Sequence, residues 1–536
     1  MATTLDPSDT SLAGTTVAGR RPSRTVLVPI ARLALFAAIG LGFLGDALLR
    51  DGPTGIGFTL FVAALVGVLA WLTKMRRVRW TLGSALLVPA TLWFAAAITW
   101  RDSGALAGYN VLALLAALSA LSWALLRGDR WEPGEAGVGA YVGGAVKSGL
   151  SAGVGVLPLL VDARIDEMAR ADASRPRRRT WPAVARGALV AAPVLLVFGA
   201  LFSAADQVFA RIVGEVFDID VFRILSHLLL AGFIAWPVAG YLRGAAVAPI
   251  DNGFERSEGW SPKLGVIEVG VVLGALDALF LLFVVVQIRY LFGGAAHVQS
   301  TAGVTYAEYA RRGFFELVWV TALTLGLLLG ANGALRRERP RDEIVFRALA
   351  WTLLSLLGVV MLSAMQRMRL YQSAYGLTET RFYATVCMIW LAVVLAWFAA
   401  TVLRGRGTPQ FAFGGLVSAW LALAVLDVAN PDAIIARNNL ARLERGANFD
   451  ATYVSTLSGD AVPVVVEQVL ALGAKIPEAD RCALELSVAE WRTTSRDDSW
   501  RRWNASRASA RLAARDPHLV ARFPGPCARP AVAHSP

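Results

Sequence analysis

The sequence predicts an all-α, polytopic helical membrane protein with about eleven transmembrane helices and a small helical extracytoplasmic domain at its C-terminal end. First, the 536 residues are 56% hydrophobic and only 17% charged, whereas soluble domains carry about 25% charged residues. Second, apolar runs of about 18 or more residues recur along most of the chain, as is typical of transmembrane helices. Third, strand-type alternation is not evident, and backbone groups in lipid need partners within their own segment, which favours helices.

The spans are expected in two groups. Four spans fill residues 25–126, and seven form a membrane core over residues 181–428. Their approximate bounds are 25–49, 54–73, 80–100, 104–126, 181–205, 221–243, 264–291, 305–335, 343–366, 379–403 and 408–428.

The remaining segments are assigned from their polarity and glycine content. Residues 1–24 are polar and without periodicity, which predicts a disordered cytoplasmic tail. Residues 127–180 form a cytoplasmic loop, whose Gly-rich stretch 137–160 carries Lys147 in mid-run. We expect this stretch to be interfacial or re-entrant, with a true span as the alternative. Residues 429–523 are expected to form short helices outside the membrane, and 524–536 a flexible tail.

The loop charges set the predicted orientation. With the N-terminus inside, cytoplasmic segments hold about three times as many Lys and Arg residues as the opposite loops. An odd number of spans then places residues 429–536 outside the cytoplasm. The formal net charge of +12 is accounted for by these loops, so we expect no nucleic-acid partner.

Cysteine and histidine usage fits this topology. Cys482 and Cys527 both fall in the region predicted to be exported, where a disulfide between them would persist. None of the four histidines is spaced with a second ligand, so no metal site and no cofactor are expected. The common hydrolase and phosphate-loop motifs are absent from the sequence. Whether the protein is an enzyme is left open, with the balance against it.

The stretch VTYAEYARRGFFE (304–316) places charges at the mouth of a span. Glu308, Arg312 and Glu316 are spaced i, i+4, i+8 and form one ladder on a helix face, whereas Arg311 points elsewhere. One interpretation is a helix cap with an intrahelical ion ladder and lipid phosphates on Arg311. The other is a site for an anionic group.

A second basic stretch, RMRLYQSAYGLTETRFY (367–383), favours the anion site. Arg369 follows one span and Arg381 starts the next, on the side that the charge bias disfavours. Guanidinium groups suit phosphate or carboxylate in a bidentate geometry. We therefore expect an anion-binding surface at the outer face, formed by Arg311, Arg312, Arg369 and Arg381 with Tyr309 and Tyr371.

Two acidic residues lie within the predicted span 264–291. Asp277 is near mid-depth, where a charge costs roughly 2.5–3.5 kcal/mol. It should face the interior, be protonated or pair with an arginine. Glu268 lies nine residues earlier, about half a turn out of phase, so the two cannot form a dyad on one face. Proton coupling and polar packing are both open roles.

Several of these stretches resemble a known family. The segments RGALVAAPVLLVFGALFSAADQVF, TYAEYARRGFFEL, RMRLYQSAYGLTETRFY, NPDAIIARNN and LSGDAVPVV are similar to bacterial polytopic membrane proteins with a domain of unknown function, of the 4153/4173 type. The resemblance runs over roughly residues 180–470, whereas the first four spans look generic. It implies a multi-span protein of the bacterial plasma (inner) membrane and supplies no catalytic residue.

Three functions remain in view. The preferred one is binding, sensing or transporting an anionic, lipid-linked ligand at the outer face, with the lipid bilayer and anionic lipid as partners. The second is a membrane-embedded transferase that uses a lipid-phosphate donor, with Glu308 or Asp277 as base. The third is a structural partner of a cell-envelope protein complex.

Overall fold

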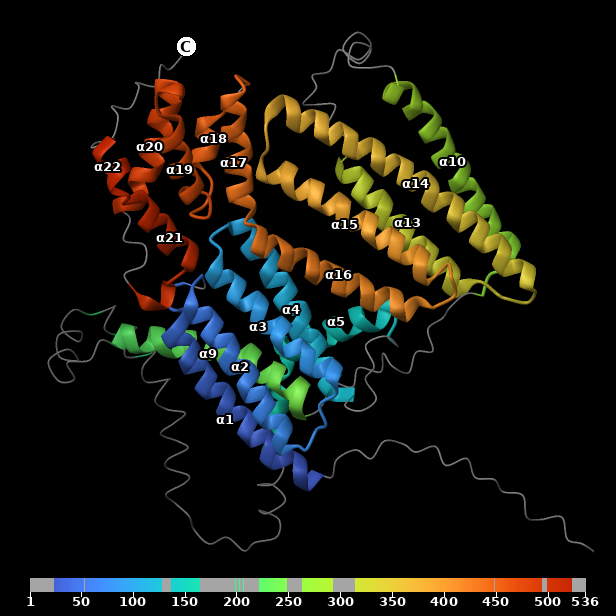
Figure 1. Ribbon diagram of the computed structural model, residues 1–536. Helices are drawn as coiled ribbons and strands as arrows, with labels where there is room; N and C mark the ends of the chain where they lie inside the picture. The colour runs from blue at the N-terminus through green and yellow to red at the C-terminus, as the bar shows by residue number, and fades with distance from the viewer. Residues whose placement is uncertain are drawn as a thin grey trace, which may run out of the picture.

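The structure is a computed structural model, and it describes residues 24–52, 54–127, 136–163, 221–247, 263–292, 314–447, 449–493 and 499–522, with the single positions 198, 202 and 206. Within these residues the fold is helical throughout, and the one β-bridge joins Leu264 to Leu335. The predicted all-α class is confirmed. The helices form two membrane clusters and a C-terminal helical unit (Figure 1).

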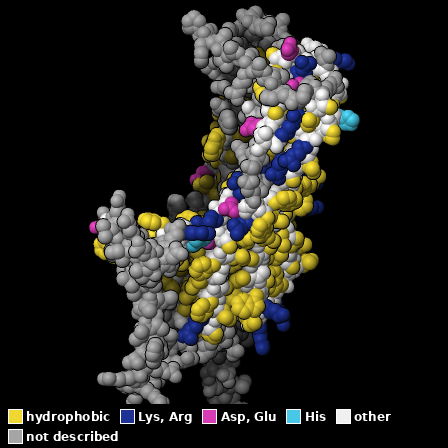
Figure 2. All heavy atoms as spheres, turned by 90° about the vertical axis from the view of Figure 1, so that its left-hand side faces the viewer, with side chains coloured by type: hydrophobic (Ala, Val, Ile, Leu, Met, Phe, Trp, Pro, Cys, Tyr) yellow, Lys and Arg dark blue, Asp and Glu magenta, His cyan; other side chains and the backbone are white. Residues whose placement is uncertain are grey.

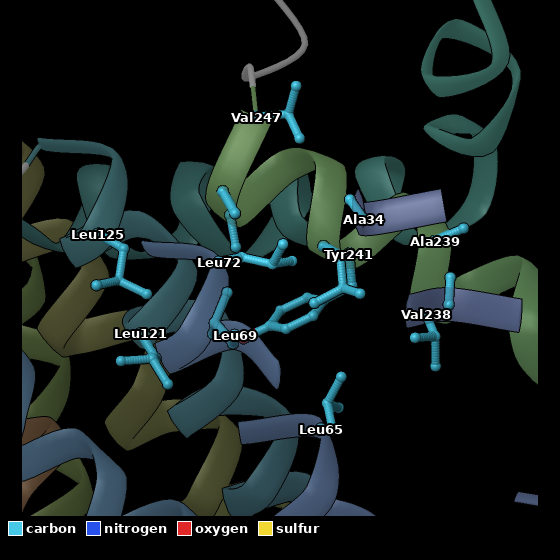
Figure 3. Close-up of a cluster of buried hydrophobic side chains, with 14 of the residues drawn as sticks. Ala34, Leu65, Leu69, Leu72, Leu121, Leu125, Val238, Ala239, Tyr241 and Val247 are labelled. Carbon is cyan, nitrogen blue, oxygen red and sulfur yellow. The ribbon is translucent and has the colours of Figure 1, made fainter. Parts of the chain in front are cut away.

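The N-terminal cluster packs leucine-rich helix faces together. Leu65, Leu69 and Leu72 recur at helical spacing on one helix and face leucines of another around the ring of Tyr241 (Figure 3). The buried Tyr241 hydroxyl donates a hydrogen bond to Leu118 O at 2.9 Å, so it is satisfied. The cluster consists of α1 (Arg24–Leu49), α2 (Ile56–Met75), α3 (Leu82–Trp100), α4 (Gly104–Arg127), α5 (Val138–Val154), α9 (Val221–Leu242) and the π-helical turn η3 (Arg243–Val247).

Small residues allow the closest approach between helices of this cluster. Gly240 and Gly244 are one turn apart, and a Cβ at either position would collide with Ser151 of α5. This is the small-xxx-small arrangement by which membrane helices bring their backbones together without a hydrophobic driving force. The backbone of α9 therefore lies directly against α5.

The second cluster, which we call the core cluster, is built around one long helix. Its buried side chains include Leu273, Leu328, Phe346, Leu353 and Phe398. It consists of α10 (Val266–Phe292), α13 (Phe314–Ala334), α14 (Pro340–Tyr375), α15 (Glu379–Thr401) and α16 (Thr408–Ala429).

Helix α14 is longer than a membrane is thick. Its 36 residues give about 54 Å at 1.5 Å per residue, against a hydrocarbon core of about 30 Å. Pro340 stands in its first turn, and the Asp342 carboxylate accepts from Glu338 N and Arg339 N. The helix ends at Gly376, whose φ of +79° favours glycine. The end of α14 therefore projects beyond the hydrocarbon core.

The C-terminal unit has a small core of its own. Buried side chains such as Ile435, Val466, Val469 and Leu484 pack together, and asparagine or aspartate side chains cap several of its helices. Its elements are α17 (Pro431–Glu444), α18 (Ala451–Ser455), α19 (Val462–Leu472), η4 (Gly473–Lys475), α20 (Glu478–Thr493), η5 (Trp500–Arg502), α21 (Ala505–Ala514) and α22 (Pro517–Arg522). The helical content predicted for residues 429–523 is thus observed.

The described residues contain nine helices that are long and apolar enough to cross a membrane, so the chain is a multi-pass membrane protein. They coincide with nine of the eleven expected spans. Of the other two, 181–205 lies outside the described residues apart from positions 198 and 202, and 305–335 is described from residue 314 onward. The Gly-rich stretch forms helices Val138–Val154 and Val156–Ala163, bent by 66°. This geometry fits a broken span or a re-entrant segment.

The helices terminate at two opposite ends of the bundle. At the first, which we call the basic end, α2 and α13 finish and α14 and α16 begin. The basic residues of this end are Lys74, Arg76, Arg77, Arg79, Arg336, Arg337, Arg339, Arg341, Arg404 and Arg406. At the other, which we call the capped end, α1, α3, α14 and α16 finish and the C-terminal unit packs on them (Figure 1). Figure 2 views the molecule from the left-hand side of Figure 1. Charged side chains gather over the upper part of this face, and the surface below them is largely apolar.

Candidate functional site

Arg381 lies in the first turn of α15 and contacts Tyr371, which the sequence analysis grouped with it. Its guanidinium carbon is 4.1 Å from the centre of the Tyr371 ring and 6.0 Å from that of Tyr375. Arg381 Nη1 also donates to Tyr375 O at 3.1 Å and to Gly376 O at 2.7 Å. A cation over an aromatic face and beside helix C-terminal carbonyls is doubly stabilised. The guanidinium is therefore held in one orientation.

Arg442 of α17 binds the same end of α14. Its Nη1 donates to Gln372 O and Ser373 O, and its Nη2 donates to Ala374 O at 3.1 Å. Together with Arg381, it satisfies carbonyls that the last turn of α14 leaves without helical partners. Arg442 is buried, with 9% of its surface exposed. The sequence prediction did not include this position.

The other predicted basic residues do not all lie beside Arg381. Arg369 is exposed on α14, and because it lies two residues before Tyr371 it faces a different side of the helix. Tyr309, Arg311 and Arg312 lie outside the described residues, as does Glu308. Glu316 falls on α13, but its side chain is likewise outside the described part. The convergence of the four arginines stays a prediction.

The two intramembrane acids have different surroundings. Asp277 is buried, with 9% exposure, and neither of its carboxyl oxygens has a hydrogen-bond partner among the described residues. Glu268 is exposed and accepts from Gly265 N at 2.5 Å at the start of α10, a capping role. Asp277 therefore lies inside the bundle, as one of its predicted alternatives requires.

A buried polar network, which we call the junction, joins the C-terminal unit to the capped end. Its centre is Asp460, which accepts from Asp102 N at 2.6 Å, from Ser103 N at 3.0 Å and from the Ser506 hydroxyl. Arg101 Nη1 lies 3.3 Å from Asp460 Oδ1. A buried carboxylate needs this density of donors, because an unpaired buried charge is strongly destabilising.

A second buried carboxylate, Asp432, lies beside this centre and is less well satisfied. Its Oδ2 accepts from the Ser458 hydroxyl at 2.5 Å, whereas its Oδ1 is buried without a partner among the described residues. Burial, aided by the like charges of Glu379 and Asp460, raises the pKa of Asp432 to about 6. Asp432 therefore keeps its proton to a higher pH than an exposed aspartate does.

The junction residues were overlooked because their signal was not a spacing of catalytic residues. Asp432 comes from NPDAIIARNN, as does Asn430, whose Nδ2 donates to Asp460 O at 3.2 Å, and Ser458 and Asp460 come from LSGDAVPVV. Both stretches set an aspartate directly beside apolar residues at a helix start. Such polar positions are retained in a core only when they are hydrogen-bonded.

No group of three or more His, Cys, Asp or Glu side chains among the described residues is placed to hold a metal ion. Cys482 is buried on α20 with 5% exposure, and Cys527 lies outside the described residues, so the disulfide stays a prediction.

The comparisons with known proteins agree with the family resemblance. The family described as a domain of unknown function (DUF4153) matches residues 88–468. The match includes both stretches that form the junction, and it begins within α3, earlier than the resemblance indicated. No curated protein and no solved structure matches the chain. Because the family match covers well over half of the sequence, the chain belongs to the DUF4153 family.

Proposed function

We propose that the protein lies in the bacterial plasma membrane with its basic end in the cytoplasm and its C-terminal unit outside. The support is the agreement between two independent features. The Lys and Arg residues of the loops favour one side of the membrane, and the C-terminal unit packs on the opposite end of the bundle from those loops.

In this orientation the protein binds an anionic ligand at its outer face, with Arg381 at the centre of the site. The observation that carries the proposal is the state of the Arg381 guanidinium. It is fixed over Tyr371 and by two carbonyls through Nη1, while Nε and Nη2 have no partner among the described residues. A guanidinium held rigid with one edge open is pre-organised for a phosphate or carboxylate. Arg311 and Arg312 are the proposed further members of the site.

Asp432 favours a second candidate function, a transferase acting on a lipid-phosphate donor. A general base works best when its pKa lies near the operating pH, and the pKa of Asp432 is raised to about 6. Glu379, one of the like charges that raise this pKa, lies two residues from Arg381 on α15. Asp432 then takes the role of base that the sequence had given to Glu308 or Asp277.

The test compares two arginines that bind the same helix end. We expect inorganic phosphate or a short-chain phosphatidylglycerol to raise the apparent Tm of the detergent-solubilised protein. In Arg381→Gln this ligand-dependent increase is lost, whereas Arg442→Gln lowers the Tm and keeps the increase, because both Nη atoms of Arg442 already donate to carbonyls of α14. Equal loss of the increase in both variants would show that Arg381 only caps α14. Turnover of a labelled lipid-phosphate that Asp432→Asn abolishes would instead support the transferase.

A further inference from the structure

The basic end contains a polar pocket of about 500 Å³ that the outer site does not involve. It is bounded by the end of α13, the start of α14 and the turn between α15 and α16, and three arginines line it: Arg337, Arg339 and Arg347. Its volume lies in the range of small-molecule sites, about 300–1,000 Å³.

Two of these arginines are oriented by one carboxylate. Glu343 accepts from Arg337 Nε at 2.7 Å and from Arg347 Nε at 2.8 Å, and Arg337 Nη2 donates to Asn332 at 2.6 Å. Arg347 Nη2 would lie 3.0 Å from a Cβ at Gly405, and the left-handed φ of +78° also favours glycine at this position. The Nη groups of Arg347 have no partner among the described residues, so a fixed guanidinium fork is presented to the pocket.

An apolar groove of about 550 Å³ lies between α14 and α15. Trp351, Gly358 and Leu362 of α14 line one wall, and Met388 and Leu395 of α15 line the other. Leu362 is 72% exposed and Trp351 is 43% exposed, so the groove opens to the lipid side of the bundle. A groove of this composition suits a hydrocarbon chain.

The pocket and the groove follow the same two helix faces. Along α14 the lining residues are Glu343, Arg347, Trp351, Ser355, Gly358 and Leu362. On α15 and its C-cap they are Met388, Ala392, Leu395, Ala399 and Val402. Residues three and four apart lie one above the other on a helix. The basic pocket and the apolar groove therefore lie along the same faces of α14 and its neighbour, and the groove begins at Trp351, one turn along α14 from Arg347.

Tryptophans mark the depth at which the two cavities meet. Trp351 follows Arg347 by one turn, and the partly exposed Trp397 of α15 donates from Nε1 to Gln410 O at the start of α16. Tryptophan is enriched at the boundary between headgroups and hydrocarbon. The arginines thus lie at headgroup level, and the groove lies in the acyl-chain layer.

We propose that this composite cavity is a binding site for one anionic phospholipid of the leaflet at the basic end. The headgroup phosphate binds Arg347, with Arg337 and Arg339 around it, and an acyl chain lies in the groove along α14 and α15. The charge favours an anion, because arginines of both neighbouring loops outnumber the acids, and Asp342 among those acids is already bound to backbone N–H groups. A free phosphate would explain the arginines and leave the apolar groove on the same helix faces without a role.

The experiment measures lipid binding to the full chain in detergent by native mass spectrometry. Dioleoyl phosphatidylglycerol and dioleoyl phosphatidylcholine are titrated separately, and inorganic phosphate is added as a competitor. We expect the wild type to bind the anionic lipid about tenfold more tightly than the zwitterionic one, the ratio for about one charge-assisted hydrogen bond. Arg347→Gln should bring this ratio close to one, whereas Arg404→Gln, which removes an exposed arginine outside the cavity lining, should leave it unchanged.

A matched pair of glycine variants tests the groove. Gly358 has open space around its Cβ position, so Gly358→Leu fills the groove without a clash and should weaken binding of the anionic lipid about tenfold. Gly67→Leu adds the same side chain at an exposed, open position on α2 and should have no effect. Equal binding of both lipids, or equal effects of the two glycine variants, would overturn the proposal. Full competition by inorganic phosphate with no effect of Gly358→Leu would assign the arginines to a free anion instead.

Discussion

Asn439 and Leu377 exchange two hydrogen bonds across 62 residues of sequence. Leu377 N donates to Asn439 Oδ1 at 2.8 Å, and Asn439 Nδ2 donates to Leu377 O at 2.7 Å. One side chain on α17 thereby satisfies both backbone groups of a buried residue in the turn between α14 and α15. The contact fixes the C-terminal unit to the end of α14, next to the carbonyls that Arg381 and Arg442 bind.

Asn439→Ala is expected to destabilise the protein by about 2–4 kcal/mol, because two buried backbone groups lose their partners. The neighbouring Asn438 is exposed, so Asn438→Ala serves as the control and should change stability by less than about 0.5 kcal/mol. The apparent Tm in detergent measures both. Similar shifts in the two variants would mean that the exchange with Leu377 contributes nothing particular to Asn439.

The membrane helices could be predicted from the sequence because apolar length alone determines them. The nine described spans, α14 among them, fall where runs of apolar residues required them, and Gly376 and Thr378 end and start helices as their residue types indicate. Helix termini and spans are local properties, so one stretch of sequence is enough to predict them.

The junction could not be predicted, because it depends on pairings between distant segments. Asp460 is bound by Asp102 and Ser103, some 357 residues away, and no local pattern joins these positions. The prediction for Arg381 was based on charge and position alone. It could not anticipate that the carbonyls of Tyr375 and Gly376 occupy one side of the guanidinium.

The contact of α9 with α5 predicts a large effect of side-chain size at Gly240. Gly240→Leu would force its side chain into the backbone at Ser151, and overpacking of this kind costs roughly 1–3 kcal/mol or more. Gly67→Leu, at an open position on α2, should be tolerated. Thermal unfolding in detergent compares the pair, and a stable Gly240→Leu protein would contradict the observed helix contact.

The proposed orientation predicts where reporter fusions are active. Fusions after residue 79, 178 or 341 should report the cytoplasm, whereas fusions after residue 430 should report export, because those loops are basic and the C-terminal unit lies at the opposite end of the bundle. A cytoplasmic signal after residue 430 would refute the orientation.

Export of the C-terminal unit also predicts that Cys482 and Cys527 are oxidised to a disulfide in protein from intact cells. Alkylation without reductant, followed by peptide mapping, should recover the two as a linked pair. Recovery of both as alkylated thiols would contradict the disulfide and would weaken the predicted topology.

The junction predicts a pH-dependent stability that depends on Asp432. Burial, with Glu379 and Asp460 nearby, raises the pKa of this carboxyl from 3.8 to about 6, so between these values the folded state binds more protons than the unfolded state. The contribution of Asp432 to the free energy of unfolding is therefore fully present below about pH 4. It is lost as the pH rises through 6, by roughly 3 kcal/mol at most.

Asp432→Asn stays neutral and can still accept from Ser458. The apparent Tm of the wild type should fall relative to that of Asp432→Asn between pH 4.5 and pH 7, while Glu467→Gln, at an exposed position of α19, should follow the wild type. A constant difference between the wild type and Asp432→Asn across this range would show that Asp432 does not titrate in the junction.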